Sequence, residues 1–275
     1  MKLGNTATRI IVSVIAIPVI IGACLAGRYY FLIFALLIGL TAFYEFAGMS
    51  KKKDAHPELI TGMSAVAAFI INTYFRFTDS YNLALIAGVV IVLVELFRNN
   101  GSAIHNIGSS FIGIFYIGLF ISSAVGVREF YAGYDALYQR GGYLIIAMLA
   151  TIWICDSAAF FGGTALGKHK LFPRVSPNKS WEGAIFGFVF AVAAMVGAKY
   201  IILDFLSLND SIMLGVIIGI IGQLGDLVES LLKRDAGVKD SSNIIPGHGG
   251  IYDRFDSLMV SAPVVFLYLK LFIKN

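Results

Sequence analysis

Residues 211–232 read SIMLGVIIGIIGQLGDLVESLL, an apolar run long enough to cross a membrane that also carries two acids near its end. The hydrocarbon core of a bilayer is about 30 Å thick, so a crossing helix needs roughly 20 mainly apolar residues. Runs of this kind predict about nine spans, which lie near residues 7–26, 29–49, 58–76, 81–97, 104–127, 142–166, 181–203, 211–232 and 255–273. The expected fold is therefore an all-α polytopic integral membrane protein.

The overall composition also indicates a membrane protein. Of the 275 residues, 58% are hydrophobic and 14% are charged, whereas soluble domains have roughly 45–50% and about 25%. The mean hydropathy is +0.81. Both cysteines, Cys24 and Cys155, lie in apolar runs, which argues against a disulfide framework and against structural zinc. The first span has some features of a signal peptide, but the eight spans after it favour a retained helix.

Basic residues are distributed unevenly between the two sides of the predicted spans. The N-terminus and the loops after spans 2, 4, 6 and 8 lie on one side and hold most of the 21 Lys and Arg residues. Such residues are enriched in cytoplasmic loops. We therefore expect a multi-pass protein of the inner (cytoplasmic) membrane, with its N-terminus and active site in the cytoplasm and its C-terminus outside. The basic loops 167–180 and 233–254 then face cytosolic nucleotides.

Acids within or beside the spans are concentrated in the second half of the chain. Up to residue 140, the exceptions are Glu45 and Glu95, near helix ends. Beyond residue 150, acids sit within or beside apolar helices. We interpret residues 1–140 as transmembrane scaffold helices and residues 141–275 as the catalytic helices and loops.

The span at 211–232 carries a polar stripe on one face. A charged group at membrane depth costs at least about 2.5–3.5 kcal/mol on insertion scales and usually marks function. At about 100° per residue, Asp226, Glu229 and Lys233 lie on one side of the helix. A salt bridge between Glu229 and Lys233 would be favourable, but it leaves Asp226 unneutralised. Mg²⁺ explains both acids, because it binds carboxylate oxygens and keeps positions for water and phosphate. The stripe predicts an intramembrane polar site facing the cytoplasm.

The following loop combines a glycine-rich turn with acids and bases. Residues 246–250 read Pro-Gly-His-Gly-Gly, a turn with few side chains that a phosphate chain could approach closely. Asp253 and Asp256 follow on one face of the next helix, where acids also have a plain capping role. Capping does not explain the other polar residues of this loop, which are Lys239, His248 and Arg254. His248 is as typical of a structural hydrogen bond as of a catalytic group.

The stretch from Ser230 to Asp256 resembles the signature of the phosphatidate cytidylyltransferase family, whose members are also called CDP-diacylglycerol synthases. Its polar and glycine positions include Ser230, Lys233, Arg234, Lys239, Asp240, Ser242, His248, Gly249, Gly250, Asp253, Arg254 and Asp256. Agreement over so many fixed polar positions is a strong signal of the family. The resemblance covers about residues 145–260, and the first 140 residues resemble the family as a hydropathy profile.

Two shorter stretches are similar to the same family. Residues 176–183 read SPNKSWEG and resemble its Ser-Pro-x-Lys-[Ser/Thr]-x-Glu-Gly loop. Residues 156–160 read DSAAF and resemble its Asp-x-x-Ala-Tyr helix. Phe160 stands where the family has tyrosine, which puts any role of that hydroxyl in doubt.

The resemblance implies an enzyme that converts CTP and phosphatidate into CDP-diacylglycerol and diphosphate. It implies Mg²⁺ as a cofactor, with a second cation such as K⁺ beside it. Asp226 and Asp253 correspond to the family's metal ligands, and Glu229 or Asp256 would assist them. The implied partners are CTP, phosphatidate and the lipid bilayer, with no nucleic acid.

We assign roles on the basis of this reaction. The phosphate of phosphatidate is already anionic at neutral pH, so positioning and charge neutralisation matter more than a strong base. The candidate catalytic residues are Lys239, Asp240, His248 and Arg254. The candidate substrate-binding residues are Lys179, Ser180, Lys233, Arg234, Gly249 and Gly250.

Other functions explain less of the sequence. Residues 162–169 nearly spell a P-loop, but His169 replaces the required hydroxyl and a membrane helix precedes the motif. A cation-coupled transporter needs polar access from both faces, whereas the polar residues gather towards one. A CTP-dependent polyprenol or phytol kinase is a nearer alternative, but the full signature argues against it. The spaced aspartates of CDP-alcohol phosphotransferases are absent.

Two small-residue motifs indicate close packing of helices. Gly183 and Gly187 form one G-x-x-x-G pair, and Gly215 and Gly219 form another. Such pairs let helix backbones approach closely. The contacts they predict lie either within the chain or across a dimer, and we expect a homodimer.

Overall fold

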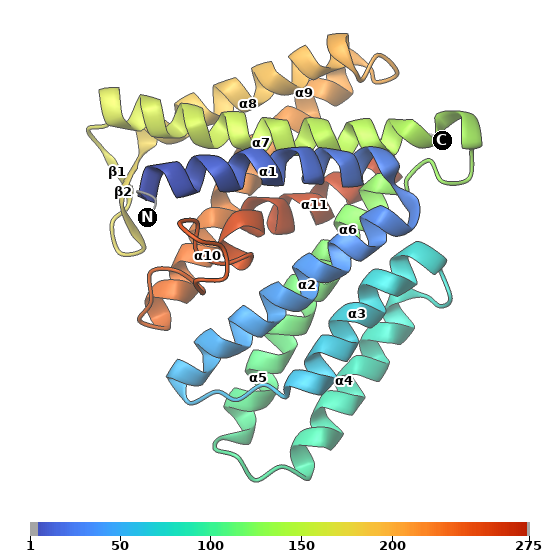
Figure 1. Cartoon of the computed structure of the whole chain (residues 1–275), viewed down its shortest axis with the longest axis vertical. Coiled ribbons are helices and arrows are strands. Elements are labelled where there is room, and N and C mark those ends of the chain that lie inside the picture. Colours follow the sequence, from blue (N-terminus) through green and yellow to red (C-terminus); the bar gives the residue numbers. More distant parts are fainter. Residues whose placement is uncertain (1–4, 274–275) are drawn as a thin grey trace. The chain divides into compact units, whose positions relative to one another are not determined.

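A computed structural model describes residues 5–273, which are mostly helical (Figure 1). The helices are α1 (Asn5–Ala26), α2 (Arg28–Ser50), α3 (Leu59–Phe75), α4 (Ser80–Leu96), α5 (Ala103–Gly113), α6 (Phe120–Arg128), α7 (Tyr138–Leu166), α8 (Trp181–Ile201), α9 (Leu208–Ile217), α10 (Gln223–Asp235) and α11 (Tyr252–Phe272). The shorter elements are the 3-10 helices η1 (Lys51–Lys53) and η3 (Asp135–Leu137), the π-helical segments η2 (Ile114–Leu119) and η4 (Ile218–Gly222), and the strands β1 (Lys170–Phe172) and β2 (Ser176–Ser180).

In the part of the chain that the structure describes, six helical stretches are long and apolar enough to cross a membrane. They are Arg28–Lys53, Ala103–Arg128, Asp135–Leu166, Trp181–Ile201, Leu208–Asp235 and Tyr252–Phe272. Three shorter apolar helices, Ile10–Ala26, Leu59–Phe75 and Ser80–Leu96, coincide with the other predicted spans. The all-α, multi-pass membrane class is confirmed, and the total of nine crossings stays a prediction.

Two of the long stretches contain a π-helical turn. Segment η2 joins α5 to α6, and η4 joins α9 to α10. A π-helical turn widens the helix locally and is frequent at functional sites. Segment η4 ends at Gly222, four residues before Asp226, so the irregular turn lies directly ahead of the acids of α10.

The chain forms two compact units. The first holds the described residues up to Gly126 together with Lys233–Phe255, and the second holds Val127–Leu232 together with the described residues from Asp256 onward. The chain passes between units within α6, α10 and α11. The loop from α10 to α11 therefore belongs to the same unit as the N-terminal helices. The functional division into a scaffold before residue 140 and catalytic helices after it stays a prediction.

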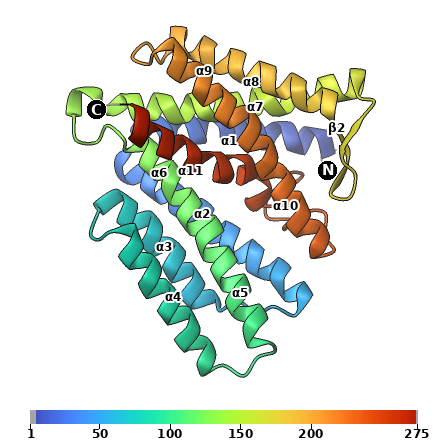
Figure 2. The same cartoon turned by 180° about the vertical axis from the view of Figure 1, so that it is seen from behind.

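In the first unit, α2 packs against α3 and α5 (Figure 2), and aromatic rings fill the spaces left by glycines at these contacts. The ring of Phe43 on α2 is fully buried. It lies against Gly62 of α3 and Gly113 of α5, where an added Cβ would overlap the rings of Phe43 and Phe46. These glycines let three helices share one aromatic core.

In the second unit, α7, α8 and α9 lie side by side (Figures 1 and 2). Gly183 and Gly187 of α8 lie against α7, where a Cβ on Gly183 would come within 2.7 Å of the carbonyl oxygen of Ala159. Gly215 of α9 and Gly219 of η4 lie against α8. Both G-x-x-x-G motifs therefore serve packing within the chain, which is one of the two arrangements that the sequence left open.

The basic loop at 167–180 folds as a short antiparallel hairpin. Strand β1 pairs with β2, with Lys170 opposite Ser180 and Phe172 opposite Ser176. The hairpin leads directly into α8, whose N-cap is Ser180. The sequence predicted a loop here, because the strands are too short and too polar to show an alternating pattern.

Candidate active site

Three carboxylates of the second unit gather where α10 passes α11. One oxygen from each of Asp226, Glu229 and Asp256 lies within 4.8 Å of the other two. Asp226 and Glu229 lie on one face of α10, as their spacing predicts, and Asp256 comes from the first two turns of α11. Glu229 is 1% exposed. Hard oxygen donors this close together suit one cation such as Mg²⁺, which would offset their mutual repulsion.

A glycine allows these two helices to approach. Gly225 directly precedes Asp226, and a Cβ at this position would lie 3.0 Å from the carbonyl oxygen of Asp256 and 3.0 Å from Cβ of Val260. Contacts this short are tighter than side chains normally accept. Because Gly225 has no side chain, α10 and α11 can approach closely enough for Asp226 and Glu229 to lie near Asp256.

Lys179 of β2 lies beside this cluster. Its Nζ is 2.5 Å from Oδ2 of Asp226, and the Ser230 hydroxyl donates to Oδ1 of Asp226 at 3.4 Å. The next residue, Ser180, caps α8 by accepting a hydrogen bond from the backbone N–H of Gly183 at 3.2 Å. The structure thus brings Lys179 to the acids, whereas Ser180 fixes the end of the hairpin.

The near match to a P-loop is not a nucleotide-binding loop. Residues 162–166 form the last turn of α7, and the strand β1 follows the motif instead of preceding it. His169 instead contacts Glu182 in the first turn of α8, with 2.6 Å between Nδ1 and Oε1. The alternative of an NTPase fold is therefore rejected.

The signature loop between α10 and α11 is a compact turn in the first unit. Ile245 N–H donates to the Gly249 carbonyl oxygen at 2.9 Å, and His248 N–H donates to that of Ile245 at 3.0 Å. Gly247 and Gly249 have φ angles of +76° and +81°, in the left-handed region that favours glycine. The Pro-Gly-His-Gly-Gly sequence is explained by this turn.

Asp253 holds the loop against the start of α11. Its carboxylate accepts hydrogen bonds from Gly250 N–H at 2.7 Å, Ser241 N–H at 3.0 Å and the Ser241 hydroxyl at 2.9 Å. Lys233 Nζ lies 2.8 Å from its Oδ1, and both side chains are largely buried. Asp253 therefore has a positioning role in the first unit, and its role as a metal ligand stays a prediction.

The other predicted residues of this region carry charge at the surface. Lys239, Asp240 and Arg254 are exposed, and Arg234 donates to the Val238 carbonyl oxygen at 3.1 Å. Exposed bases of this kind are available to phosphate oxygens.

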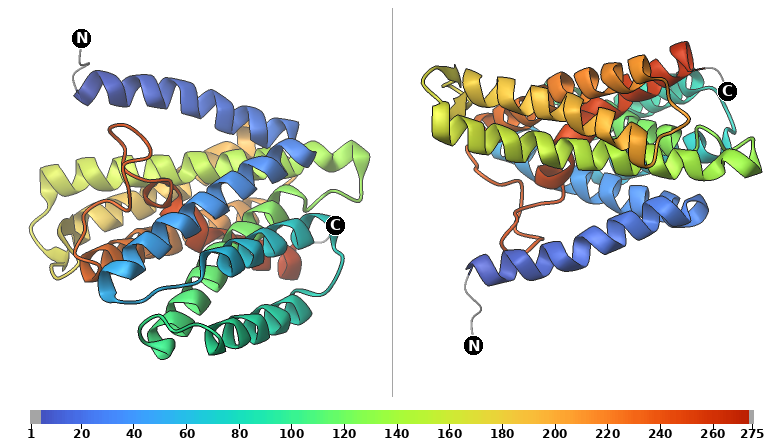
Figure 3. Two further views of the ribbon diagram at one scale, coloured as in Figure 1. Left: turned by 60° about the horizontal axis from the view of Figure 1, so that its bottom comes forward. Right: turned by 90° about the horizontal axis from the view of Figure 1, so that it is seen from above.

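The loop between α10 and α11 extends towards α1 (Figure 3), and His248 of this loop contacts Ser13 of α1. Its Nε2 is 3.4 Å from the Ser13 hydroxyl. Its Nδ1 is buried and has no hydrogen-bond partner among the described residues. The structure therefore supplies a contact for one ring nitrogen and leaves the choice between a structural and a catalytic role open.

Sequence reasoning missed one polar residue that contacts this loop. Glu45 of α2 is buried, and its carboxylate accepts hydrogen bonds from residues at both ends of the loop. The only signal in the sequence is an acid in an apolar helix of the predicted scaffold.

Comparison with known proteins places the chain in a family. The model of the cytidylyltransferase family matches residues 7–272. The chain belongs to the cytidylyltransferase family. The match extends the resemblance from about residues 145–260 to nearly the whole chain, including the helices before residue 140.

Curated members of the cytidylyltransferase family are similar to the chain over almost its full length. The phosphatidate cytidylyltransferase of Bacillus subtilis (strain 168) is 32% identical, and the alignment covers 96% of this chain and 97% of the relative. That of Staphylococcus aureus (strain COL) is 34% identical and covers 96% and 98%. That of Brucella suis biovar 1 (strain 1330) is 32% identical and covers 98% and 95%.

Proposed function

We propose that this protein is a phosphatidate cytidylyltransferase, which converts CTP and phosphatidate into CDP-diacylglycerol and diphosphate. The observation that carries the proposal is sequence identity of 32% and 34%, over 96% of this chain, to relatives of that name. The exposed bases and the glycine-rich turn of the signature loop support it, because they suit a ligand rich in phosphate.

The reaction exchanges one phosphoanhydride bond for another. An oxygen of the phosphatidate phosphate forms a bond to the α-phosphorus of CTP, and the oxygen that bridges the α- and β-phosphorus leaves with diphosphate. The attacking oxygen is already anionic, so the protein must mainly position the phosphates and offset their charge. We assign this work to Lys239 and Arg254, where the guanidinium of Arg254 can hold two phosphate oxygens at once.

We infer that Asp226, Glu229 and Asp256 hold Mg²⁺. When bound, the ion supplies positive charge to the triphosphate. The close grouping of their oxygens supports this inference, and Lys179 neutralises part of the charge of Asp226. We also propose that Asp253 is a further metal ligand and that K⁺ is a second cation.

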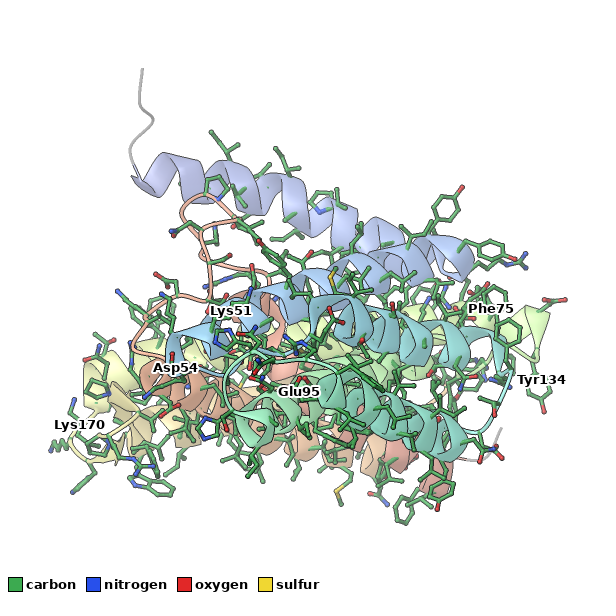
Figure 4. The ribbon with its side chains drawn as sticks, turned by 90° about the horizontal axis from the view of Figure 1, so that it is seen from below. Lys51, Asp54, Phe75, Glu95, Tyr134 and Lys170 are labelled. Carbon is green, nitrogen blue, oxygen red and sulfur yellow. The ribbon has the colours of Figure 1, made fainter. Side chains whose placement is uncertain are left out.

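We further propose nine crossings of the inner membrane, with the N-terminus and the active site in the cytoplasm and the C-terminus outside. The helices α3 and α4 have 17 residues each, which is about 25 Å of helix and near the lower limit for a crossing. Figure 4 shows Lys51 and Asp54 at one end of the first unit and Phe75 at the other. Helices that alternate in this way support successive crossings. The homodimer is part of this proposal, and light scattering in detergent tests it.

The decisive experiment uses purified protein, phosphatidate and CTP labelled at the α-phosphorus. We expect a labelled lipid that appears with Mg²⁺ and is lost with EDTA. A kinase would label the lipid only from γ-labelled CTP, and a transporter would make no labelled lipid. Absence of an α-labelled lipid under all conditions would refute the proposed function.

A further inference from the structure

Glu45 is a buried acid on α2 that contacts the signature loop. It is 3% exposed. Its Oε1 accepts hydrogen bonds from the Ser242 hydroxyl at 2.5 Å and from Ile251 N–H at 3.0 Å. Its Oε2 accepts from the Ser241 hydroxyl at 3.1 Å and from Tyr252 N–H at 2.7 Å. Each carboxylate oxygen therefore has one hydroxyl donor and one backbone donor.

These contacts explain how a charge is tolerated inside an apolar helix. A buried carboxylate is costly unless hydrogen bonds replace its water. Ile251 and Tyr252 lie at the start of α11, where backbone N–H groups lack partners within their own helix and the dipole favours an anion. Glu45 thus caps α11 from a helix that is about 200 residues away in the sequence.

Two further residues of the signature, Ser241 and Gly250, also lie against the Glu45 carboxylate. The Ser241 hydroxyl lies 3.1 Å from Glu45 and 2.9 Å from Asp253, so it links the two acids. A Cβ on Gly250 would overlap both the Ser241 hydroxyl and the Glu45 carboxylate. Gly250, which we expected to bind substrate, is therefore needed for the close approach of Glu45 to the loop.

We propose that Glu45 is a positioning residue for nucleotidyl transfer: it holds the loop 241–252, and through it the flanking Lys239 and Arg254, in the geometry that the reaction needs. This inference rests on the proposed function. It gives a helix of the N-terminal scaffold a part in the activity, which Glu45 exerts through its hydrogen bonds to the loop.

The arrangement of donors allows a sharp test with glutamine. A backbone N–H can only donate a hydrogen bond. Each oxygen of Glu45 accepts from a different backbone N–H, Oε1 from Ile251 and Oε2 from Tyr252. In Glu45→Gln, one of the two oxygens becomes an NH₂ group, which also donates. In either orientation of the amide, therefore, one backbone N–H of the α11 start loses its acceptor. The substitution changes hydrogen bonding and charge while side-chain volume stays nearly constant.

Glu95→Gln is the matched control within the first unit. Glu95 is 6% exposed, close to the value for Glu45. Its carboxylate accepts hydrogen bonds from two side chains, Asn106 Nδ2 at 2.6 Å and Arg98 Nη1 at 2.8 Å. We expect both variants to lose stability, because each loses a buried acceptor. Only Glu45→Gln should change the loop.

Two measurements on protein in lipid nanodiscs separate positioning from general stability. In Glu45→Gln we expect kcat/KM for CTP to fall by about 100-fold, the effect typical of a small misplacement of reacting groups. We also expect faster amide hydrogen exchange in the peptide that covers residues 241–252. Glu95→Gln should keep the wild-type kcat/KM and loop exchange.

Equal effects of the two variants on activity, or wild-type exchange of the loop in Glu45→Gln, would overturn the inference. If Glu45→Gln does not fold, Ser242→Ala removes one donor and leaves the acid in place. We then expect a smaller rise in exchange across the loop and a smaller loss of kcat/KM, and no change in either would overturn the inference. The exchange readout does not need the reaction, so wild-type protein that makes no labelled lipid refutes the proposed function separately.

Discussion

Asp226 and Asp253 were the two acids that the family resemblance selected, and each is paired with a lysine in a different environment. The side chains of Lys179 and Asp226 are 30% and 32% exposed, whereas those of Lys233 and Asp253 are 12% and 2% exposed. A partly exposed pair contributes about 0–1 kcal/mol. Removing one partner of a buried pair costs about 3–5 kcal/mol. The first pair therefore leaves Asp226 available for function, and the second mainly stabilises the loop.

This difference predicts the stability of two lysine variants. We expect Lys233→Met to lower the free energy of unfolding by about 3 kcal/mol, because it leaves the buried Asp253 carboxylate short of one partner. Lys179→Met should lower it by no more than about 1 kcal/mol. Thermal unfolding in detergent measures both, and equal shifts of the two variants would contradict the burial of the second pair.

The metal assignment predicts the behaviour of Asp226→Asn. The substitution keeps the shape of the side chain and removes its charge, so we expect kcat/KM to fall by at least about 100-fold with little change in unfolding temperature. The control is Asp204→Asn, at an exposed position between α8 and α9 of the same unit. Full activity of Asp226→Asn at ordinary Mg²⁺ concentrations would exclude Asp226 as a ligand.

At the scale of elements, the acid cluster depends on how closely α10 and α11 approach. The period of the helix places Asp226 and Glu229 on one face of α10, and this was predicted. Asp256 joins them because Gly225 has no side chain at the crossing. No local pattern identifies the partner of a single glycine, so this contact could not be predicted from the sequence.

The crossing predicts the effect of bulk at Gly225. In Gly225→Leu, the new side chain must push α11 away, which separates Asp256 from the other acids. We expect a loss of activity together with a higher Mg²⁺ concentration for half-maximal rate in whatever activity remains. Gly197→Leu on α8 is the control, because a Cβ there meets no atom within 4 Å and leucine favours a helix by about 0.8 kcal/mol over glycine. Similar losses in both variants would contradict a specific role of the crossing.

Across the whole chain, the number of spans follows from the lengths of the apolar helices. The orientation of each span follows from the side of the membrane on which its flanking loops lie. In the second unit, Lys170 and Tyr134 lie at opposite ends (Figure 4). Both are exposed. The positive-inside rule predicts that Lys170 faces the cytoplasm and Tyr134 the other side.

Single cysteines test this orientation. In a background without Cys24 and Cys155, we expect a membrane-impermeant maleimide to label Lys170→Cys in inverted membrane vesicles. It should label Tyr134→Cys in vesicles of the opposite orientation. Labelling of both positions from one side would contradict the alternation of the spans and with it the proposed nine crossings.

The membrane class, the polar face of α10 and the family could all be predicted from the amino-acid sequence, because each depends on spacing along the chain. An apolar run of 20 residues, a helical stripe and a set of fixed positions are all local. The contacts between distant residues became visible in the folded chain. Lys179 contacts Asp226 across 47 positions, Lys233 contacts Asp253 across 20, and Glu45 contacts Ile251 across 206. Such contacts depend on how helices pack against one another, and a sequence read alone contains no distance between its helices.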